Sequence, residues 1–219
     1  AKAPLKLTKA QMEMVTDLSF SGNKLTDVKD LEKLTQLKGL SLRNNKLTEL
    51  PKGLEKLTQL TRLDLDNNKL TDVKGLEKLT KLKELNLYKN QLTEVSVLAG
   101  LKQLEKLDLS FNRVTDLRPL KGLTQLKKLN LDGNKLNNIS PLAALTQLEE
   151  LQLYNTKISD VSVLRKLTQL TQLSLGNNKI TDFSPLAELT RLESLDLAFR
   201  IDGNPITDEQ LKHLAGLKK

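Results

Sequence analysis

The stretch TDVKGLEKLTKLKELNLYKNQL, from Thr71 to Leu92, contains the unit that decides the fold of this chain. Its centre is the pattern Leu-x-Leu-x-x-Asn, which recurs along the chain in steps of about 22 residues. The first leucine of the pattern falls at Leu18, Leu40, Leu63, Leu85, Leu107, Leu129, Leu151, Leu173 and Leu195. A fixed period of this length predicts a solenoid, in which one small structural unit is stacked many times.

Leucines also recur every three residues between these patterns, as in Leu31, Leu34 and Leu37. This period suits a 3₁₀-like or irregular segment better than a long α-helix. Each unit is then a short strand, a turn and a tight return, and it can bury its leucines only against its neighbours. The fold class that we predict is α/β: a right-handed solenoid with a parallel concave sheet of about nine strands and a mostly 3₁₀ or irregular convex side.

An asparagine closes the pattern in nearly every unit. It falls at Asn23, Asn45, Asn68, Asn90, Asn112, Asn134 and Asn178, and Thr156 replaces it once. A side-chain amide both donates and accepts hydrogen bonds, so in a turn it can satisfy backbone groups that the strands leave unpaired. We expect a hydrogen-bonded ladder of asparagines, in which Thr156 keeps part of that capacity.

The chain is predicted to be one domain, residues 1–219. Residues 1–17 form an N-terminal cap, 18–206 the repeats and 207–219 a C-terminal cap helix. Thr8 to Gln11 fit a capping box that opens a short helix. Thr207 to Gln210 fit a second box, which opens a helix that buries Leu211 and Leu214.

Two units depart from the period. The segment from Leu50 to Leu54 makes its unit one residue longer, which we expect to bulge the convex side only. Four extra residues around Phe199 to Asp202 displace the expected asparagine to Asn204. This insertion has two interpretations, a functional loop or a local adjustment before the cap.

Composition argues against an enzyme. There is no cysteine and one histidine, His213, which we place on the solvent side of the cap helix. No phosphate loop, dinucleotide fingerprint, zinc-protease motif or calcium loop is present. We therefore predict no catalytic activity, no cofactor and no metal, since a calcium site at Asp64, Asp66 and Asp108 would need several more oxygen ligands. No apolar run approaches the roughly 18 residues of a membrane span.

If both leucines of Leu-x-Leu are buried, the residues before, between and after them line the concave face. Its acidic members are Asp17, Asp64, Asp66, Glu84, Asp108, Asp132, Glu150 and Asp196, and its basic members are Arg43, Arg62, Lys106 and Lys128. The face thus carries a net charge of −4. Because the chain carries +8, the remainder carries +12. We expect its lysines to be dispersed over the convex side and the turns, so a nucleic-acid partner is not predicted.

Tyr88 and Tyr154 occupy equivalent concave positions, about 14–15 Å apart at strand spacing. Tyrosine is enriched among interface hot spots. The charged residues beside the tyrosines have two interpretations, cross-strand salt bridges or specificity for a bound protein. The predicted partner-binding residues are Arg43, Arg62, Asp64, Asp66, Tyr88, Lys106, Asp108, Lys128, Asp132 and Tyr154.

The pattern LxxLxLxxNxL with this spacing resembles the leucine-rich-repeat superfamily, and most of all its internalin-like bacterial class. The resemblance covers about residues 15–206 and implies partner binding. The chain lacks the cysteine-rich caps of extracellular animal members, and a secreted or cell-surface bacterial location is favoured over a cytoplasmic one.

The leading hypothesis is a monomeric protein–protein interaction module that binds its partner on the concave face. The alternatives are a structural or substrate-recruiting segment of a larger protein, and a binder of acidic polymers through a basic convex surface.

Overall fold

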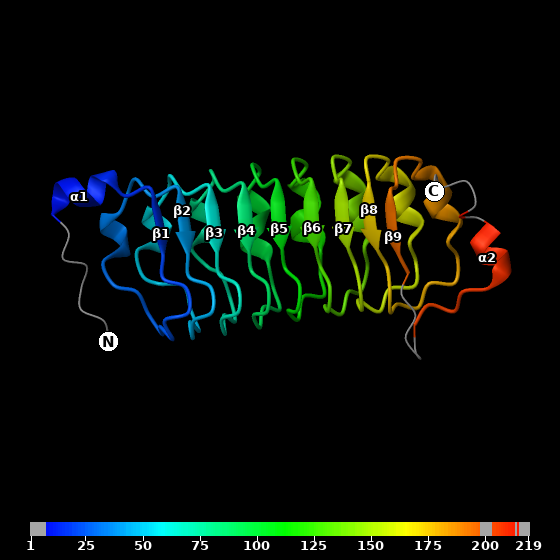
Figure 1. Cartoon of the computed structure of the whole chain (residues 1–219), viewed down its shortest axis with the longest axis horizontal. Helices are drawn as coiled ribbons and strands as arrows, with labels where there is room; N and C mark the ends of the chain where they lie inside the picture. The colour runs from blue at the N-terminus through cyan, green and yellow to red at the C-terminus, as the bar shows by residue number, and fades with distance from the viewer. Residues whose placement is uncertain (1–7, 198–202, 213, 215–219) are drawn as a thin grey trace.

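The structure is a computed structural model that describes residues 8–197, 203–212 and 214. Nine parallel strands form one sheet in sequence order, as predicted (Figure 1). The strands are β1 Asp17–Ser19, β2 Gly39–Ser41, β3 Arg62–Asp64, β4 Glu84–Asn86, β5 Lys106–Asp108, β6 Lys128–Asn130, β7 Glu150–Gln152, β8 Gln172–Ser174 and β9 Ser194–Asp196.

The register of the sheet places the leading leucines in one row. Leu40 pairs with both Leu18 and Leu63, and the same pairing continues to Leu195. The extra residue between Leu50 and Leu54 does not disturb this register, because it lies outside the sheet, where Gly53 adopts a left-handed φ of 86°. The predicted bulge is therefore confined to the return segment.

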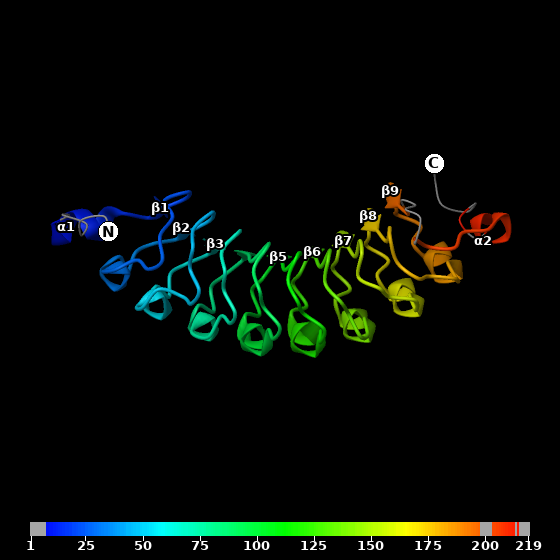
Figure 2. The same ribbon diagram turned by 90° about the horizontal axis from the view of Figure 1, so that it is seen from below.

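The return segments are 3₁₀ helices, which confirms the prediction made from leucines three residues apart. They are η1 Leu31–Lys33, η2 Leu54–Lys56, η3 Leu76–Lys78, η4 Ser96–Gly100, η5 Arg118–Gly122, η6 Ser140–Ala144, η7 Ser162–Lys166 and η8 Ser184–Glu188. A 3₁₀ helix has three residues per turn, so leucines at this spacing lie on one face. Figure 2 shows the result: the strands line the inside of an arc and the 3₁₀ helices its outside.

The core is a stack of leucines between these two layers. The unit from Thr71 to Leu92 buries seven apolar side chains, each no more than 2% exposed: Val73, Leu76, Leu79, Leu82, Leu85, Leu87 and Leu92. Burial of one such side chain contributes roughly 1.5–3 kcal/mol, which offsets the loss of chain entropy in each unit. The uniform core keeps the concave sheet regular from β2 to β8.

The turn asparagines form the predicted ladder. In Asn68, Nδ2 donates to the carbonyl oxygens of Leu42 (3.0 Å) and Leu65 (3.1 Å), and Oδ1 accepts from the Leu47 N–H (3.1 Å). From Asn45 onward, each turn asparagine thus ties its own turn to the preceding unit. Thr156 keeps one of these bonds, from Oγ1 to the Leu153 carbonyl oxygen (2.9 Å).

Short helices flank the repeats. Helix α1, Lys9–Met14, has the predicted capping box, in which Gln11 N–H donates to Thr8 Oγ1 (3.2 Å) and Thr8 N–H to Gln11 Oε1 (2.9 Å). Helix α2, Asp208–Lys212, begins where the second box was predicted. Leu214 packs against the core.

The displaced asparagine takes its expected place in the ladder. Asn204 Nδ2 donates to the Leu175 carbonyl oxygen (2.8 Å), and Oδ1 accepts from Ile180 N–H (3.1 Å). The insertion from Phe199 to Asp202 and His213 lie outside the described residues, as does the Leu211 side chain. No helix in the described part of the chain is long and apolar enough to cross a membrane.

Candidate protein-binding face

The concave face consists of three rows of side chains that run across the strands. The first row contains the first residue of each strand, from Asp17 to Ser194, and the middle row contains the last residue, from Ser19 to Asp196. The turn row lies two residues further on and includes Arg43, Asp66, Tyr88, Ser110, Asp132 and Tyr154. Parallel pairing brings residues of one row within strand spacing of each other, about 4.8 Å per unit.

Ion pairs neutralise the cations of the first row. Lys106 Nζ lies 2.7 Å from Glu84 Oε1, and Lys128 pairs with Glu150 on the adjacent strand. Cross-strand salt bridges therefore form, as one of the two interpretations expected, but with other partners. The acidic partners, however, come from the first row itself and not from Asp64, Asp108 or Asp132.

Arg62 reaches across two units to Asp17, with Nη2 to Oδ1 at 2.7 Å. Gly39 lies between them, and a Cβ there would be only 2.3 Å from Asp17 Oδ1. The absence of a side chain at Gly39 therefore leaves room for this pair. Both partners are more than half exposed, so the pair contributes no more than about 1 kcal/mol to stability.

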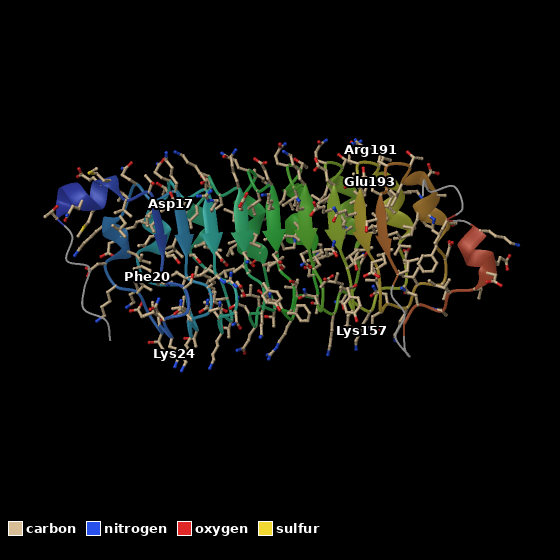
Figure 3. All side chains as sticks on the ribbon, viewed as in Figure 1. Asp17, Phe20, Lys24, Lys157, Arg191 and Glu193 are labelled. Carbon is tan, nitrogen blue, oxygen red and sulfur yellow. The ribbon has the colours of Figure 1, made fainter. Side chains whose placement is uncertain are left out.

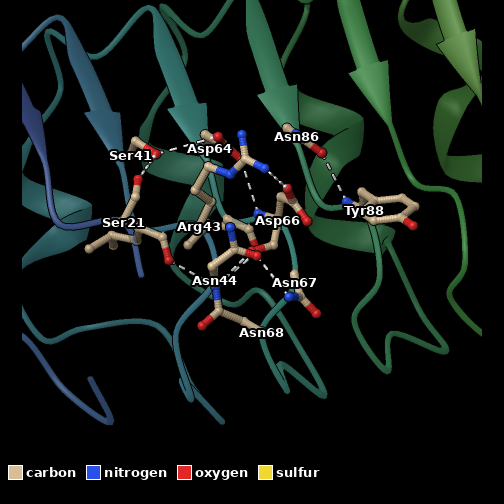
Figure 4. Close-up of polar contacts among 12 residues, drawn as sticks. Ser21, Ser41, Arg43, Asn44, Asp64, Asp66, Asn67, Asn68, Asn86 and Tyr88 are labelled. Atoms are coloured by element: carbon tan, nitrogen blue, oxygen red, sulfur yellow. Dashed lines mark hydrogen bonds and ion pairs between the residues drawn. The ribbon is translucent and has the colours of Figure 1, made fainter. Parts of the chain in front are cut away.

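The turn row contains the fourth concave cation, Arg43, and it too is paired. Arg43 Nη2 lies 3.3 Å from Asp66 Oδ2. Figure 4 draws this ion pair as a dashed line. Asp66 is only 7% exposed, and its Oδ1 has no hydrogen-bond partner. Burial raises the pKa of Asp66, and the neighbouring Arg43 charge opposes that rise.

Three concave carboxylates lack an ion pair within the described residues: Asp64, Asp108 and Asp132. They have neutral donors instead. Ser110 N–H donates to Asp108 Oδ1 (2.8 Å), and Tyr154 N–H donates to Asp132 Oδ1 (2.7 Å). Burial raises the pKa of Asp132 to about 6, against the opposing hydrogen bond from Tyr154. The negative charge of the face is therefore concentrated in the middle and turn rows.

Tyr88 has an aromatic partner that the sequence analysis missed. Its ring contacts that of Phe111 edge to face, with the centroids 5.5 Å apart and the planes at 75°. Phe111 is 50% exposed and has a left-handed φ of 53°. The equivalent positions in the other units hold Gly22, Asn44, Asn67, Lys89, Gly133, Asn155 and Asn177.

A bulky residue in this backbone region is uncommon, at a cost of roughly 1–2 kcal/mol. An edge-to-face aromatic pair contributes about 0.5–1.5 kcal/mol to stability. Packing therefore gives Phe111 little net advantage over asparagine. The signal in the sequence was an aromatic residue in a turn where the other units have polar residues or glycine. Tyr154 is half-buried, and no aromatic partner for it lies in the described residues.

The predicted site residues do not gather in one pocket. A hollow of about 640 Å³ lies over β1 to β5 and is lined by the first and middle rows, including Arg62, Asp64, Lys106 and Asp108. The other six predicted residues lie outside its lining. In the described part of the chain, no three histidine, aspartate or glutamate side chains are grouped as metal ligands would be.

The positive charge of the turns is more ordered than expected. One cation follows the turn asparagine or its substitute in seven units: Lys24, Lys46, Lys69, Arg113, Lys135, Lys157 and Lys179. Figure 3 shows Lys24 and Lys157 on one long edge of the solenoid, opposite the edge that holds Arg191 and Glu193. We call these seven residues the turn-edge cations. None has an ion pair within the described residues.

The comparisons with known proteins agree with this architecture. The model of the family "Leucine Rich repeats (2 copies)" matches residues 14–56, 35–78, 58–100, 102–144, 124–166, 146–188 and 168–216. Internalin C2 from Listeria monocytogenes is 38% identical, with a TM-score of 0.85, and the match covers 88% of this chain and 84% of that one. No curated protein matches the chain.

Two further structures are similar. Internalin InlF from Listeria monocytogenes is 30% identical, with a TM-score of 0.63, over 96% of this chain and 74% of that one. The ectodomain of the Arabidopsis thaliana receptor kinase GASSHO1, solved in complex with CASPARIAN STRIP INTEGRITY FACTOR 2, is 27% identical, with a TM-score of 0.67, over 86% of this chain and 27% of that one. With its nine-stranded parallel sheet, its asparagine ladder and these matches, the chain belongs to the leucine-rich-repeat family and to its internalin-like class.

Proposed function

We propose that this chain is a non-catalytic interaction module that holds a protein partner on its concave face. The observation that carries the proposal is the half-exposed Phe111 ring beside Tyr88, on a curved sheet whose backbone is held by a continuous leucine core. A preformed surface binds at low ordering cost, and aromatic side chains are frequent hot spots. The GASSHO1 ectodomain in its complex is an example of a similar solenoid with a bound partner.

The contact residues that we propose lie on β2 to β7 and the turns after them. They are Arg43, Arg62, Asp64, Asp66, Tyr88, Lys106, Asp108, Lys128, Asp132 and Tyr154, and we add Phe111 because its ring contacts that of Tyr88. The ion pairs of the first row would serve as a polar rim, because partly exposed pairs add specificity more than affinity. Tyr88 and Phe111 would supply the apolar contact area at the centre. We also propose that the chain acts as a monomer and, on its likeness to the Listeria internalins, at the cell surface or after secretion.

The test begins with capture of a partner from the native source and measurement of its affinity. The double variant Tyr88→Ala/Asp108→Ala should weaken binding at least tenfold, because it removes the aromatic centre and one unpaired carboxylate. The matched control is Lys166→Ala/Glu188→Ala on the convex 3₁₀ helices, which should leave binding unchanged. Loss of binding in the control together with full binding in the concave variant would contradict the proposal.

The turn-edge cations favour a second candidate, binding of an anionic polymer along that edge. Seven cations at about 4.8 Å per unit resemble the charge spacing of a linear polyanion. An acidic residue follows most of the turn-edge cations by three positions, as Asp27, Glu49 and Asp72 do, and it lowers the net charge of the edge. Retention on heparin that persists at several hundred millimolar salt would support this candidate, and elution at low salt would exclude it.

A further inference from the structure

The charges of the concave face are not balanced evenly over its surface. All four concave cations have ion pairs with concave acids, at Arg43, Arg62, Lys106 and Lys128. The carboxylates left without an ion pair in the described residues, Asp64, Asp108 and Asp132, lie in the middle and turn rows. The middle row contains no lysine or arginine at all. A partner that approaches these two rows therefore meets carboxylates that no concave cation neutralises.

The aromatic pair lies among these carboxylates. Phe111 N–H donates to the Asp132 carbonyl oxygen (2.7 Å), which joins its turn to the next unit. On the other side, Ser110 directly precedes Phe111 and donates to Asp108. The Phe111 ring packs over Gly133, where a Cβ would be 3.1 Å from Phe111 Cδ1, and its edge-to-face contact with Tyr88 closes the cluster.

The carboxylate of Asp66 belongs to the turn row beside the same cluster. Asp66 precedes Tyr88 by one unit in the turn row, and its Oδ1 is buried without a hydrogen-bond partner, although Arg43 contacts its Oδ2. Lys89 directly follows Tyr88, and its backbone N–H donates to the Ser110 carbonyl oxygen (2.9 Å). The Lys89 side chain is exposed and has no ion pair in the described part of the chain.

We propose that the concave face binds a cationic peptide segment, in which an arginine side chain stacks on the Tyr88–Phe111 pair and bonds the carboxylates of Asp108 and Asp132. This inference rests on the proposed function and specifies its partner. A guanidinium group matches such a site because it stacks on aromatic rings and donates two parallel hydrogen bonds to a carboxylate. The whole chain carries +8, so long-range attraction would select an anionic partner instead. If the chain binds a cationic peptide in preference to an anionic one, the preference must therefore come from a local negative site.

The experiment uses three fluorescent 12-residue peptides of glycine and leucine in which every third residue is arginine, citrulline or glutamate. Citrulline has nearly the shape of arginine but no charge. Fluorescence anisotropy with the full chain at 0.15 M salt measures their affinities. The arginine peptide should bind at least tenfold more tightly than the citrulline peptide, and the glutamate peptide most weakly.

Two variants test the location of the site. Asp108→Asn/Asp132→Asn should abolish the preference for arginine, whereas the charge-matched control Glu49→Gln/Glu94→Gln, at exposed positions, should keep it. Phe111→Asn introduces the residue type that is most frequent at this turn position in the other units, so the variant should fold normally. Its affinity for the arginine peptide should nevertheless fall at least fivefold.

Each outcome separates this inference from the proposed function. Equal affinity for arginine and citrulline peptides, or no binding of the arginine peptide at about 1 mM, overturns the cationic site. If Phe111→Asn then weakens the binding of a captured protein partner, the proposal that a protein binds the concave face is retained. A preference for arginine that survives every concave variant overturns the location of the site and removes this support for the concave face.

Discussion

Replacing Asn112 with alanine removes the amide that ties the turn after β5 to the unit of β4. Asn112 Nδ2 donates to the Leu87 and Leu109 carbonyl oxygens, both at 2.9 Å, and Oδ1 accepts from Leu92 N–H at 3.0 Å. The side chain is 7% exposed, so water would not easily replace these bonds. Asn112→Ala leaves three buried groups unsatisfied, each costing about 1–3 kcal/mol, so it should lower the free energy of unfolding by about 3 kcal/mol or more.

Thr156 provides the matched comparison. Its hydroxyl bonds the Leu153 carbonyl oxygen but does not reach Leu131, and Leu136 N–H donates to the Thr156 backbone oxygen instead of to a side chain. Asn112→Thr should therefore cost about half as much as Asn112→Ala. Thr156→Asn restores the missing bonds and should raise the free energy of unfolding by about 1 kcal/mol.

Urea unfolding followed by circular dichroism measures all three variants. If the wild type unfolds in more than one step, hydrogen exchange of the Leu92 and Leu136 amides reports each rung separately. A change of less than about 1 kcal/mol in the unfolding free energy for Asn112→Ala, or destabilisation by Thr156→Asn, would refute this role of the asparagine amide.

Further predictions concern the concave face and the turn that holds Phe111. Burial raises the pKa of Asp132 from 3.8 to about 6, so the folded state binds more protons between these pH values and the free energy of unfolding falls as the pH rises through them. Asp132→Asn should remove this fall from the unfolding free energy measured by urea titration at each pH. A steeper fall in the variant than in the wild type would contradict the prediction. Gly39→Ala should disrupt the Arg62–Asp17 pair at a cost of about 1 kcal/mol or less, measured in a double-mutant cycle with Asp17→Asn; a coupling above about 2 kcal/mol would be inconsistent with so exposed a pair. Phe111→Asn should change the unfolding free energy by less than about 1 kcal/mol, since left-handed strain and ring packing offset each other; a larger loss in thermal or urea unfolding would assign Phe111 a structural role.

The fold could be predicted from the sequence because the buried leucines that determine it recur at a fixed interval. Leu85 and its equivalents repeat at one interval, and no unit can bury such residues alone, so stacking, strand order and the asparagine ladder could all be predicted. The capping box at Thr8 was local enough to identify in the same way. The pattern also predicts that Asn204 occupies the position of the turn asparagine in its unit, and its bond with Ile180 N–H agrees.

The candidate site was harder to predict because it depends on side-chain direction. Strand alternation placed Arg62 on the concave face, but not its contact with Asp17 two units away, which depends on the open space at Gly39. Counting only strand positions also excluded Phe111. Its left-handed turn directs the ring onto Tyr88, and a period in the sequence carries no information about backbone angles in one particular turn.

Hydroxyl-radical footprinting of the chain with its captured partner tests the central claim most directly, because aromatic and sulfur side chains react readily and report their own exposure. Binding on the concave face predicts strong protection of Tyr88, Phe111 and Tyr154, while Met14, 80% exposed in α1, keeps its reactivity. Unchanged reactivity of all three aromatic residues, with protection on the 3₁₀ helices or the turn edge, would contradict the account.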